Sequence, residues 1–232
     1  SSDVCSSDLG APARKVAFSV PTGNFGNIFA GYAAQRMGLP IERFVVGSNR
    51  NDILFRLLDT GTMKMEGVAP TLSPSMDIQV SSNFERLLFE VTGRDGSRVA
   101  ETLARFRKDG RYRLDEGAMG QVRGLFEGYC LDDAGTLETI RRIYKSTGEL
   151  IDPHTAIGIA AAERARLDPM LPVVAVATAH PAKFSDAMER AVGFRPPLPE
   201  RLRAMMDEKE RVSDLANDLK AIEAFVADRV KG

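Results

Sequence analysis

Hydrophobic positions along the chain follow two alternating spacings. Short apolar runs at 15–20, 42–48 and 171–179 predict buried strands. Apolar residues at helical spacing follow the first run, and we expect that helix to close at Gly38. Alternation of strands and helices is typical of an α/β fold with a largely parallel sheet.

The remaining pattern predicts a further short strand at 127–131 and a long connection over 60–80. That connection is rich in Gly, Pro, Ser and Thr, and loops of such length in a compact domain are usually functional or mobile. Helical spacing returns in several segments: 51–59, 83–92, 97–108, 136–147, 157–166, 182–193, 200–210 and 214–230.

Three regions divide the chain. Residues 1–10 repeat Ser-Ser-Asp and have too few apolar side chains to join a core, so we interpret them as a non-native or disordered leader. Residues 11–195 form the α/β domain, and 196–232 form a helical tail after a Pro-rich break. We expect the domain to be incomplete at its N-terminus, because it opens on a strand without an element to shield the sheet edge.

Charge and cysteine content narrow the classes of partner. The 31 Lys and Arg residues nearly balance 32 Asp and Glu residues, so no basic field indicates nucleic acid or an anionic membrane. A small molecule or another protein is the expected partner. Only Cys5 and Cys130 are present, which excludes a disulfide framework and fits a reducing compartment. Without a signal peptide or a membrane-spanning run, the sequence predicts a cytoplasmic protein.

A turn of sequence TGNFGN at residues 22–27 joins the first strand to the first helix. Such a junction presents unpaired backbone N–H groups, aided by the helix dipole, to an anion. Gly23 and Gly26 allow close backbone approach, while Asn24 and Asn27 add donors. The turn is neither a Walker loop nor a G-x-G-x-x-G turn, so the phosphate of a non-nucleotide cofactor is the candidate ligand. The alternative is a tight connection in which Gly and Asn merely permit positive φ.

The segment SSNFER offers a second anion site. Ser81 and Ser82 precede a helix that begins near Asn83, so hydroxyls, N-terminal amides and Arg86 could converge on one phosphate or carboxylate. The alternative is a plain capping box with Ser82 as N-cap and Glu85 at the third helical position.

Two later segments carry further candidates. In DPHTA, Asp152 or Thr155 is expected to cap a helix, and His154 is a candidate general acid or base. Thr178 follows a strand end, where ligands collect in parallel sheets. Lys183 lies at a helix start, where a solvated lysine is more common than a Schiff-base lysine. With only two histidines and no spaced acidic ligands, no metal site is expected.

Four segments, SVPTGNFGNIFAGYAAQRMGLPI, TLSPSMDIQVSSNFERLLFE, DPHTAIGIAAAE and ATAHPAKF, occur in the order and spacing of threonine synthase. The chain resembles that family over most of residues 15–195. The family is pyridoxal-phosphate dependent and has the tryptophan-synthase-β type of fold, fold type II. The resemblance implies the three-layer, parallel-sheet large domain of such an enzyme. It also implies the conversion of O-phospho-L-homoserine and water to L-threonine and phosphate.

The resemblance also implies roles for individual residues. The cofactor-binding set is Gly23, Asn24, Phe25, Gly26 and Asn27 at the pyridoxal phosphate group, with Thr178 at the pyridine nitrogen. The substrate-side set is Ser82, Asn83 and Arg86 at the substrate phosphate, with His154 and Thr155 as active-site wall. The family's Schiff-base lysine lies upstream of the Gly/Asn turn, and nothing before Val16 resembles its segment. We therefore expect this chain alone to be inactive.

Two other classes of function stay open. A non-catalytic relative could bind pyridoxal phosphate or another anion as a sensor or partner subunit. A related pyridoxal-phosphate lyase or β-replacement enzyme could act on another amino acid. The second phosphate-binding turn argues against the latter, because it is expected only when the substrate itself is phosphorylated. An incomplete sheet would expose apolar surface, so the isolated chain is expected to associate.

Overall fold

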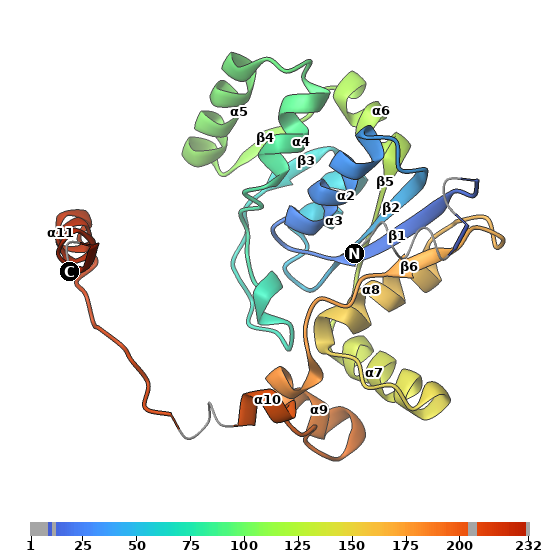
Figure 1. The fold of residues 1–232 in the computed structure, drawn as a ribbon. Helices are drawn as coiled ribbons and strands as arrows, with labels where there is room; N and C mark the ends of the chain where they lie inside the picture. Colours follow the sequence, from blue (N-terminus) through green and yellow to red (C-terminus); the bar gives the residue numbers. More distant parts are fainter. Residues whose placement is uncertain (1–8, 11–12, 204–207, 231–232) are drawn as a thin grey trace. The chain divides into compact units, whose positions relative to one another are not determined.

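A four-stranded parallel sheet forms the centre of the fold (Figure 1). The computed structural model describes residues 9–10, 13–203 and 208–230. The chain divides into two units, 1–196 and 197–232, and the first contains the sheet. The strands are β1 (Val16–Pro21), β2 (Ile41–Ser48), β5 (Phe126–Cys130) and β6 (Val173–Ala175), in the order β5-β2-β1-β6.

The register of the sheet places the Gly/Asn turn and the segment that contains Thr178 at one edge. Phe18 pairs with Phe44 and Ser19 with Ala175, all in parallel, so the carboxyl ends of the strands meet at the same edge. β1 is buried throughout, as predicted. β6 is shorter and less buried than predicted: it pairs only with β1 in the described sheet, and Val173 is 36% exposed.

One face of the sheet packs against α2, α3, α4 and α6 around a large apolar core. Phe44 stacks on Phe126 at 5.5 Å between ring centroids and anchors this core. Helix α5 and a small antiparallel ribbon, β3 with β4, contribute Phe106, Met63 and Tyr112 to the same core, and the ribbon falls partly within the predicted connection. The elements are α2 (Gly26–Arg36), α3 (Ile53–Thr60), β3 (Thr62–Lys64), η1 (Pro74–Met76), α4 (Phe84–Val91), α5 (Gly96–Asp109), β4 (Arg111–Arg113) and α6 (Glu116–Leu125).

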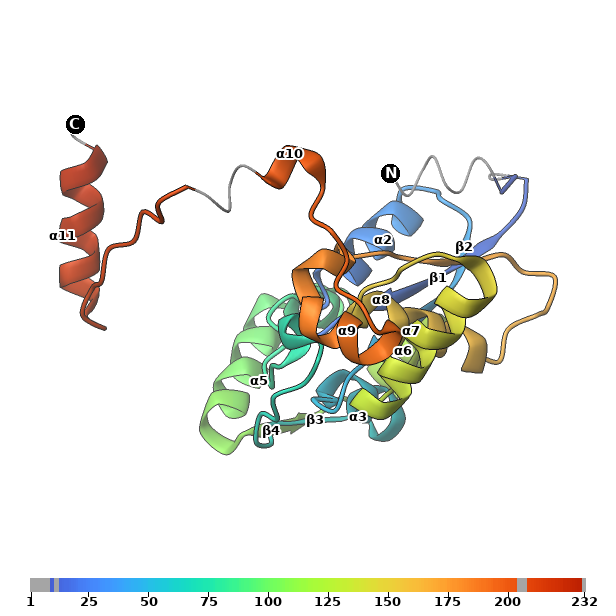
Figure 2. The same ribbon diagram turned by 90° about the horizontal axis from the view of Figure 1, so that it is seen from below.

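The other face packs on α8 (Pro153–Arg164), whose small side chains let it lie close to the strands. Ser19 Oγ donates to the carbonyl oxygen of Gly158 at 2.6 Å, and a Cβ on Gly47 would lie 3.1 Å from Ile157 Cγ2. Figure 2 shows α7 and α9 side by side outside α8. The remaining elements here are α7 (Asp133–Thr147), η2 (Pro181–Phe184) and α9 (Ser185–Val192). The domain is thus a three-layer α/β structure.

The second unit contains α10 (Glu200–Arg203) and α11 (Leu219–Val230). The helix predicted over 200–210 is therefore seen only in its first turn, and residues 204–207 lie outside the described residues. The leader predicted at 1–10 lies outside them too, apart from residues 9–10. Within the described ranges, no helix has the length and apolar character needed to cross a membrane.

Candidate functional site

The Gly/Asn turn lies at the carboxyl end of β1 and is held by a buried aromatic side chain. Phe25 adopts a left-handed conformation, with φ +66° and ψ +4°, which is uncommon for a residue other than glycine. Its ring is 1% exposed and packs at 5.1 Å from Phe84 and 5.7 Å from Phe126. Thr22 Oγ1 accepts a hydrogen bond from the Phe25 N–H at 2.9 Å. Burial of Phe25 therefore offsets the local strain of the turn.

Helix α2 starts without a side-chain cap. It has no acidic residue in its first turn, and Asn27 is exposed beside its first amides. The first N–H groups of a helix have no partner within the helix and carry its positive dipole end. Helices α5, α6, α7 and α8 are each capped by an aspartate, namely Asp95, Asp115, Asp132 and Asp152. Helices α3, α4 and α9 lack a side-chain cap, as α2 does. The start of α2 can therefore bind an anion.

The two glycines of the turn have different neighbours. A Cβ on Gly23 would lie 3.0 Å from Met76 Cα and 3.0 Å from Ile78 Cγ1. A Cβ on Gly26 would lie 3.4 Å from Asn83 Nδ2. A side chain at position 23 would therefore crowd residues 76 and 78, which pack over the turn, and the sequence pattern did not predict this contact.

Asn24 joins the two predicted anion sites. Its Oδ1 accepts hydrogen bonds from the Ser82 backbone N–H at 2.8 Å and from Ser82 Oγ at 2.7 Å. The Asn24 carbonyl oxygen accepts from the Asn83 N–H at 3.2 Å. The structure therefore brings together two turns that are 58 residues apart in the chain.

These contacts exclude the capping-box alternative for the second turn. The N-cap of α4 is Asn83, no side chain caps the helix, and the Ser82 hydroxyl is bonded to Asn24. Ser81 Oγ is buried without a hydrogen-bond partner among the described residues. Arg86 is exposed, with its guanidinium carbon 5.7 Å from the centre of the Phe29 ring on α2. Hydroxyl and guanidinium donors thus remain for a ligand beside α2.

The segment DPHTA forms a buried polar cluster at the start of α8. Asp152 is fully buried and caps the helix, accepting from the backbone N–H groups of His154 at 2.9 Å and Thr155 at 3.3 Å. It also binds His154 Nδ1 at 2.8 Å and the Thr155 hydroxyl. Burial alone would raise the pKa of Asp152, but the hydrogen bonds from His154 and Thr155 outweigh burial and hold that pKa below its usual value. The Thr155 hydroxyl is therefore already engaged.

His154 has one ring nitrogen left for other contacts. Its Nε2 is buried without a hydrogen-bond partner in the described part of the chain. Its ring packs 4.9 Å from that of Phe184 in η2. Thr178 precedes η2, is exposed, and follows β6 at the same sheet edge as the Gly/Asn turn. Lys183 is exposed too, with Nζ 5.8 Å from the centre of the Phe184 ring.

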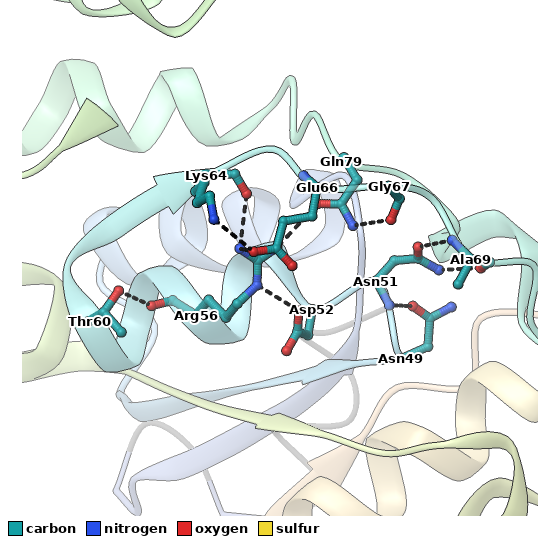
Figure 3. A network of polar contacts seen from close by, with 10 residues as sticks. All are labelled: Asn49, Asn51, Asp52, Arg56, Thr60, Lys64, Glu66, Gly67, Ala69 and Gln79. Carbon is teal, nitrogen blue, oxygen red and sulfur yellow. Dashed lines mark hydrogen bonds and ion pairs between the residues drawn. The ribbon is translucent and has the colours of Figure 1, made fainter. Parts of the chain in front are cut away.

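A polar network that the sequence pattern did not predict lies beside the turn. Asn49, directly after β2, donates from Nδ2 to Thr71 Oγ1 at 2.8 Å and to Asp77 Oδ1 at 2.8 Å. Asn51 pairs with the backbone of Ala69 through two hydrogen bonds (Figure 3). The sequence signal for this network is the pair of asparagines, Asn49 and Asn51, that follows the predicted strand 42–48. Elsewhere in the described ranges, no group of three or more His, Cys, Asp or Glu residues is arranged to hold a metal ion.

The fold and this edge define the class of protein. The parallel sheet with helices on both faces is that of the fold type II pyridoxal-phosphate proteins, as in the solved threonine synthases that it matches. The structure of the Brucella melitensis threonine synthase, described as bound to pyridoxal phosphate, superposes with a TM-score of 0.91 at 45% identity, over 99% of this chain and 49% of that one. The yeast threonine synthase gives a TM-score of 0.84 at 35% identity, over 96% and 49%.

Sequence comparisons identify the same family. The model of the family "Threonine synthase, C-terminal" matches residues 155–226. The threonine synthase of Pseudomonas aeruginosa is 49% identical over 94% of this chain and 47% of its own length. That of Corynebacterium glutamicum is 40% identical, over 94% and 46%. The chain is similar to threonine synthases over nearly its whole length, and it spans about half the length of the curated relatives that it matches.

Proposed function

We propose that this chain provides the cofactor-phosphate turn and the substrate-phosphate turn of a threonine synthase. The reaction is the conversion of O-phospho-L-homoserine and water to L-threonine and phosphate, a step of amino-acid biosynthesis that we place in the cytoplasm. The observation that supports it best is the uncapped start of α2, joined through Asn24 to Ser82. Two adjoining anion sites suit a phosphorylated cofactor beside a phosphorylated substrate.

The residues at the sheet edge fit pyridoxal phosphate. The unpaired amides at the start of α2, with residues 23–27, would hold its phosphate. The Thr178 hydroxyl would meet its pyridine nitrogen, and a neutral hydroxyl does not enforce protonation there as a carboxylate would. When bound, the cofactor supplies a ring that withdraws electrons from the substrate carbons.

The substrate side is formed by the start of α4. Asn83 and Arg86 would bind the substrate phosphate and hold it as it leaves. Ser82, whose backbone N–H and hydroxyl both donate to Asn24, would hold this turn beside the cofactor turn. His154 and Thr155 line the site, and Asp152 fixes both of them. The Schiff-base lysine would come from a segment that this sequence does not include. Lys183 is solvated and lies near Phe184, which favours a structural role for it.

Asn27→Asp tests the cofactor site, because it changes stability and binding in opposite directions. A carboxylate in the first turn of α2 stabilises the helix by about 0.3–1 kcal/mol. The same charge repels a bound phosphate, and at about 4 Å this costs up to roughly 4 kcal/mol at intermediate dielectric. We expect pyridoxal phosphate, titrated by absorbance and fluorescence, to bind at least about tenfold more weakly.

The matched control is Asn217→Asp, an exposed site in the second unit with the same change in charge. It should leave pyridoxal phosphate affinity unchanged. Equal affinity in wild type and Asn27→Asp would refute the assignment of the phosphate to the start of α2.

Arg86→Met tests the substrate class, with Arg94→Met, in the turn that follows α4, as control. O-phospho-L-homoserine should perturb the spectrum of the bound cofactor at lower concentration than L-homoserine does. Arg86→Met should remove most of that preference, because the guanidinium recognises the phosphate. Equal preference in wild type and Arg86→Met would show that this arginine does not recognise the substrate phosphate.

A further inference from the structure

The connection over residues 65–80 is fixed at its ends, although its composition is that of a mobile loop. Arg56 on α3 donates to the Lys64 carbonyl oxygen at 3.0 Å and to Gln79 Oε1 at 3.2 Å. Asp52 orients this guanidinium through a 2.7 Å bond to Nε (Figure 3). Because Lys64 precedes the connection and Gln79 lies at its end, Arg56 holds the two ends together.

Asp77, near the end of the connection, binds Thr71 within it and the asparagines that follow β2. Its Oδ1 accepts hydrogen bonds from Asn49 Nδ2 at 2.8 Å, from Asn51 Nδ2 at 2.9 Å and from Thr71 Oγ1 at 2.7 Å. Its Oδ2 accepts from the Thr71 backbone N–H at 2.9 Å. Four donors surround one carboxylate, and the two asparagines are buried directly after β2. Charge-assisted bonds of this kind are stronger than neutral ones.

The residues on either side of Asp77 lie against the Gly/Asn turn. Met76 and Ile78 approach Gly23 so closely that the Cβ of an alanine there would meet both at 3.0 Å. Such contact leaves no space for the turn to move toward the connection. The position of Asp77 therefore determines the position of one wall of the turn.

We propose that Asp77 is a positioning residue for the phosphate site. Anchored to Asn49 and Asn51, it holds residues 76–78 against Gly23 and so keeps the turn in its anion-binding shape before the ligand arrives. A site that is organised in advance binds more tightly, because binding does not have to order it. The inference rests on the proposed function, since its ligand is the phosphate of pyridoxal phosphate.

The test replaces the charge and then restores it elsewhere. Asp77→Asn replaces a carboxylate oxygen, which accepts from the Asn49 and Asn51 amides, by an amide group that donates. If a tenth of the molecules then keep the turn in its anion-binding shape, pyridoxal phosphate binds about tenfold more weakly. The double variant Asp77→Asn with Asn49→Asp reverses the amide–carboxylate pair and should recover affinity to within about twofold. A role in stability alone predicts no such recovery of affinity.

Asp115→Ala is the control, because it removes the cap of α6 away from the turn. It should lower the urea midpoint and leave pyridoxal phosphate affinity unchanged. If Asp77→Asn does not fold, Thr71→Val carries the test, with an expected loss of about threefold. It removes the hydroxyl contacts to Asp77, Asn49 and Ser73 and keeps the bond from the Thr71 backbone N–H to Asp77.

Three outcomes are decisive. Weaker binding by Asp77→Asn, restored in the double variant, supports the positioning role. Wild-type affinity in Asp77→Asn, or in Thr71→Val where that variant replaces it, overturns the role and leaves the phosphate site standing. Absence of saturable binding in the wild type overturns the proposed function together with this inference.

Discussion

Replacement of Asp152 by alanine should destabilise the chain far more than loss of an ordinary helix cap. The cap itself contributes about 1 kcal/mol. The change also leaves His154 Nδ1 and the Thr155 hydroxyl buried without their partner, at about 1–3 kcal/mol each. These contributions sum to about 3–7 kcal/mol. We expect the lower part of that range, about 3–5 kcal/mol in the free energy of unfolding, as for removal of one partner from a buried pair.

Asp132→Ala is the matched control, because Asp132 caps α7 from an exposed position through one bond to Gly135 at 2.8 Å. It should cost about 1 kcal/mol. Urea unfolding followed by circular dichroism at neutral pH measures both variants. An Asp152→Ala variant no less stable than Asp132→Ala would refute the importance of the buried cluster.

The same cluster predicts a pH dependence. The pKa of Asp152 is lowered in the folded state, so its stabilisation is present above the unfolded value of about 3.9. That stabilisation is lost as the pH falls through the lower, folded value. The gap in unfolding free energy between wild type and Asp152→Ala should therefore narrow under acid conditions. If the stability difference between wild type and Asp152→Ala widened as the pH falls, the pKa of Asp152 would not be lowered in the folded state.

Two further predictions concern packing and ionisation. Gly31→Ala should destabilise the chain by about 1–3 kcal/mol, because its Cβ would lie 2.6 Å from Phe44 Cε1. Gly120→Ala in α6 meets nothing within 4 Å and should raise the free energy of unfolding by up to about 1 kcal/mol, so equal urea midpoints for the two variants would contradict the prediction. Burial, and then the hydrogen bond to Glu127, raise the pKa of Tyr129 to about 12. Glu127→Gln should therefore lower the pKa of Tyr129 toward 10 in an ultraviolet titration, in which Tyr129→Phe identifies the signal of this tyrosine. An unchanged titration curve would contradict the hydrogen bond between Tyr129 and Glu127.

The sequence predicted those elements whose limits are marked by residues next to them in the chain. β1, α2 and β2 were placed within a few residues, because a buried run, a Gly-bearing turn and a helix stop follow one another in the chain. Helix α6 was missed, since three glycines in ten residues hide its periodicity. Burial of Ala118, Met119 and Val122 stabilises it instead. The three-residue strand β3 depends on its pairing with β4, which no local pattern reports.

The site shows the same division. The residues of both turns could be predicted, because Gly, Asn and Ser before a helix are local signals. The contact of Asn24 with Ser82 and that of Asn49 with Asp77 join residues far apart in the chain, so only the fold reveals them. The close approach of Met76 to Gly23 likewise depends on how the connection folds back. Long-range contacts thus decide how the predicted residues are arranged.

A crystal structure of the protein in complex with pyridoxal phosphate would test directly whether the start of α2 binds the cofactor phosphate. We expect the phosphate within hydrogen-bond distance of the backbone N–H groups of Gly26 and Asn27, with the Thr178 hydroxyl at the pyridine nitrogen. A phosphate bound elsewhere, or a covalent link from the cofactor to Lys183, would contradict this expectation.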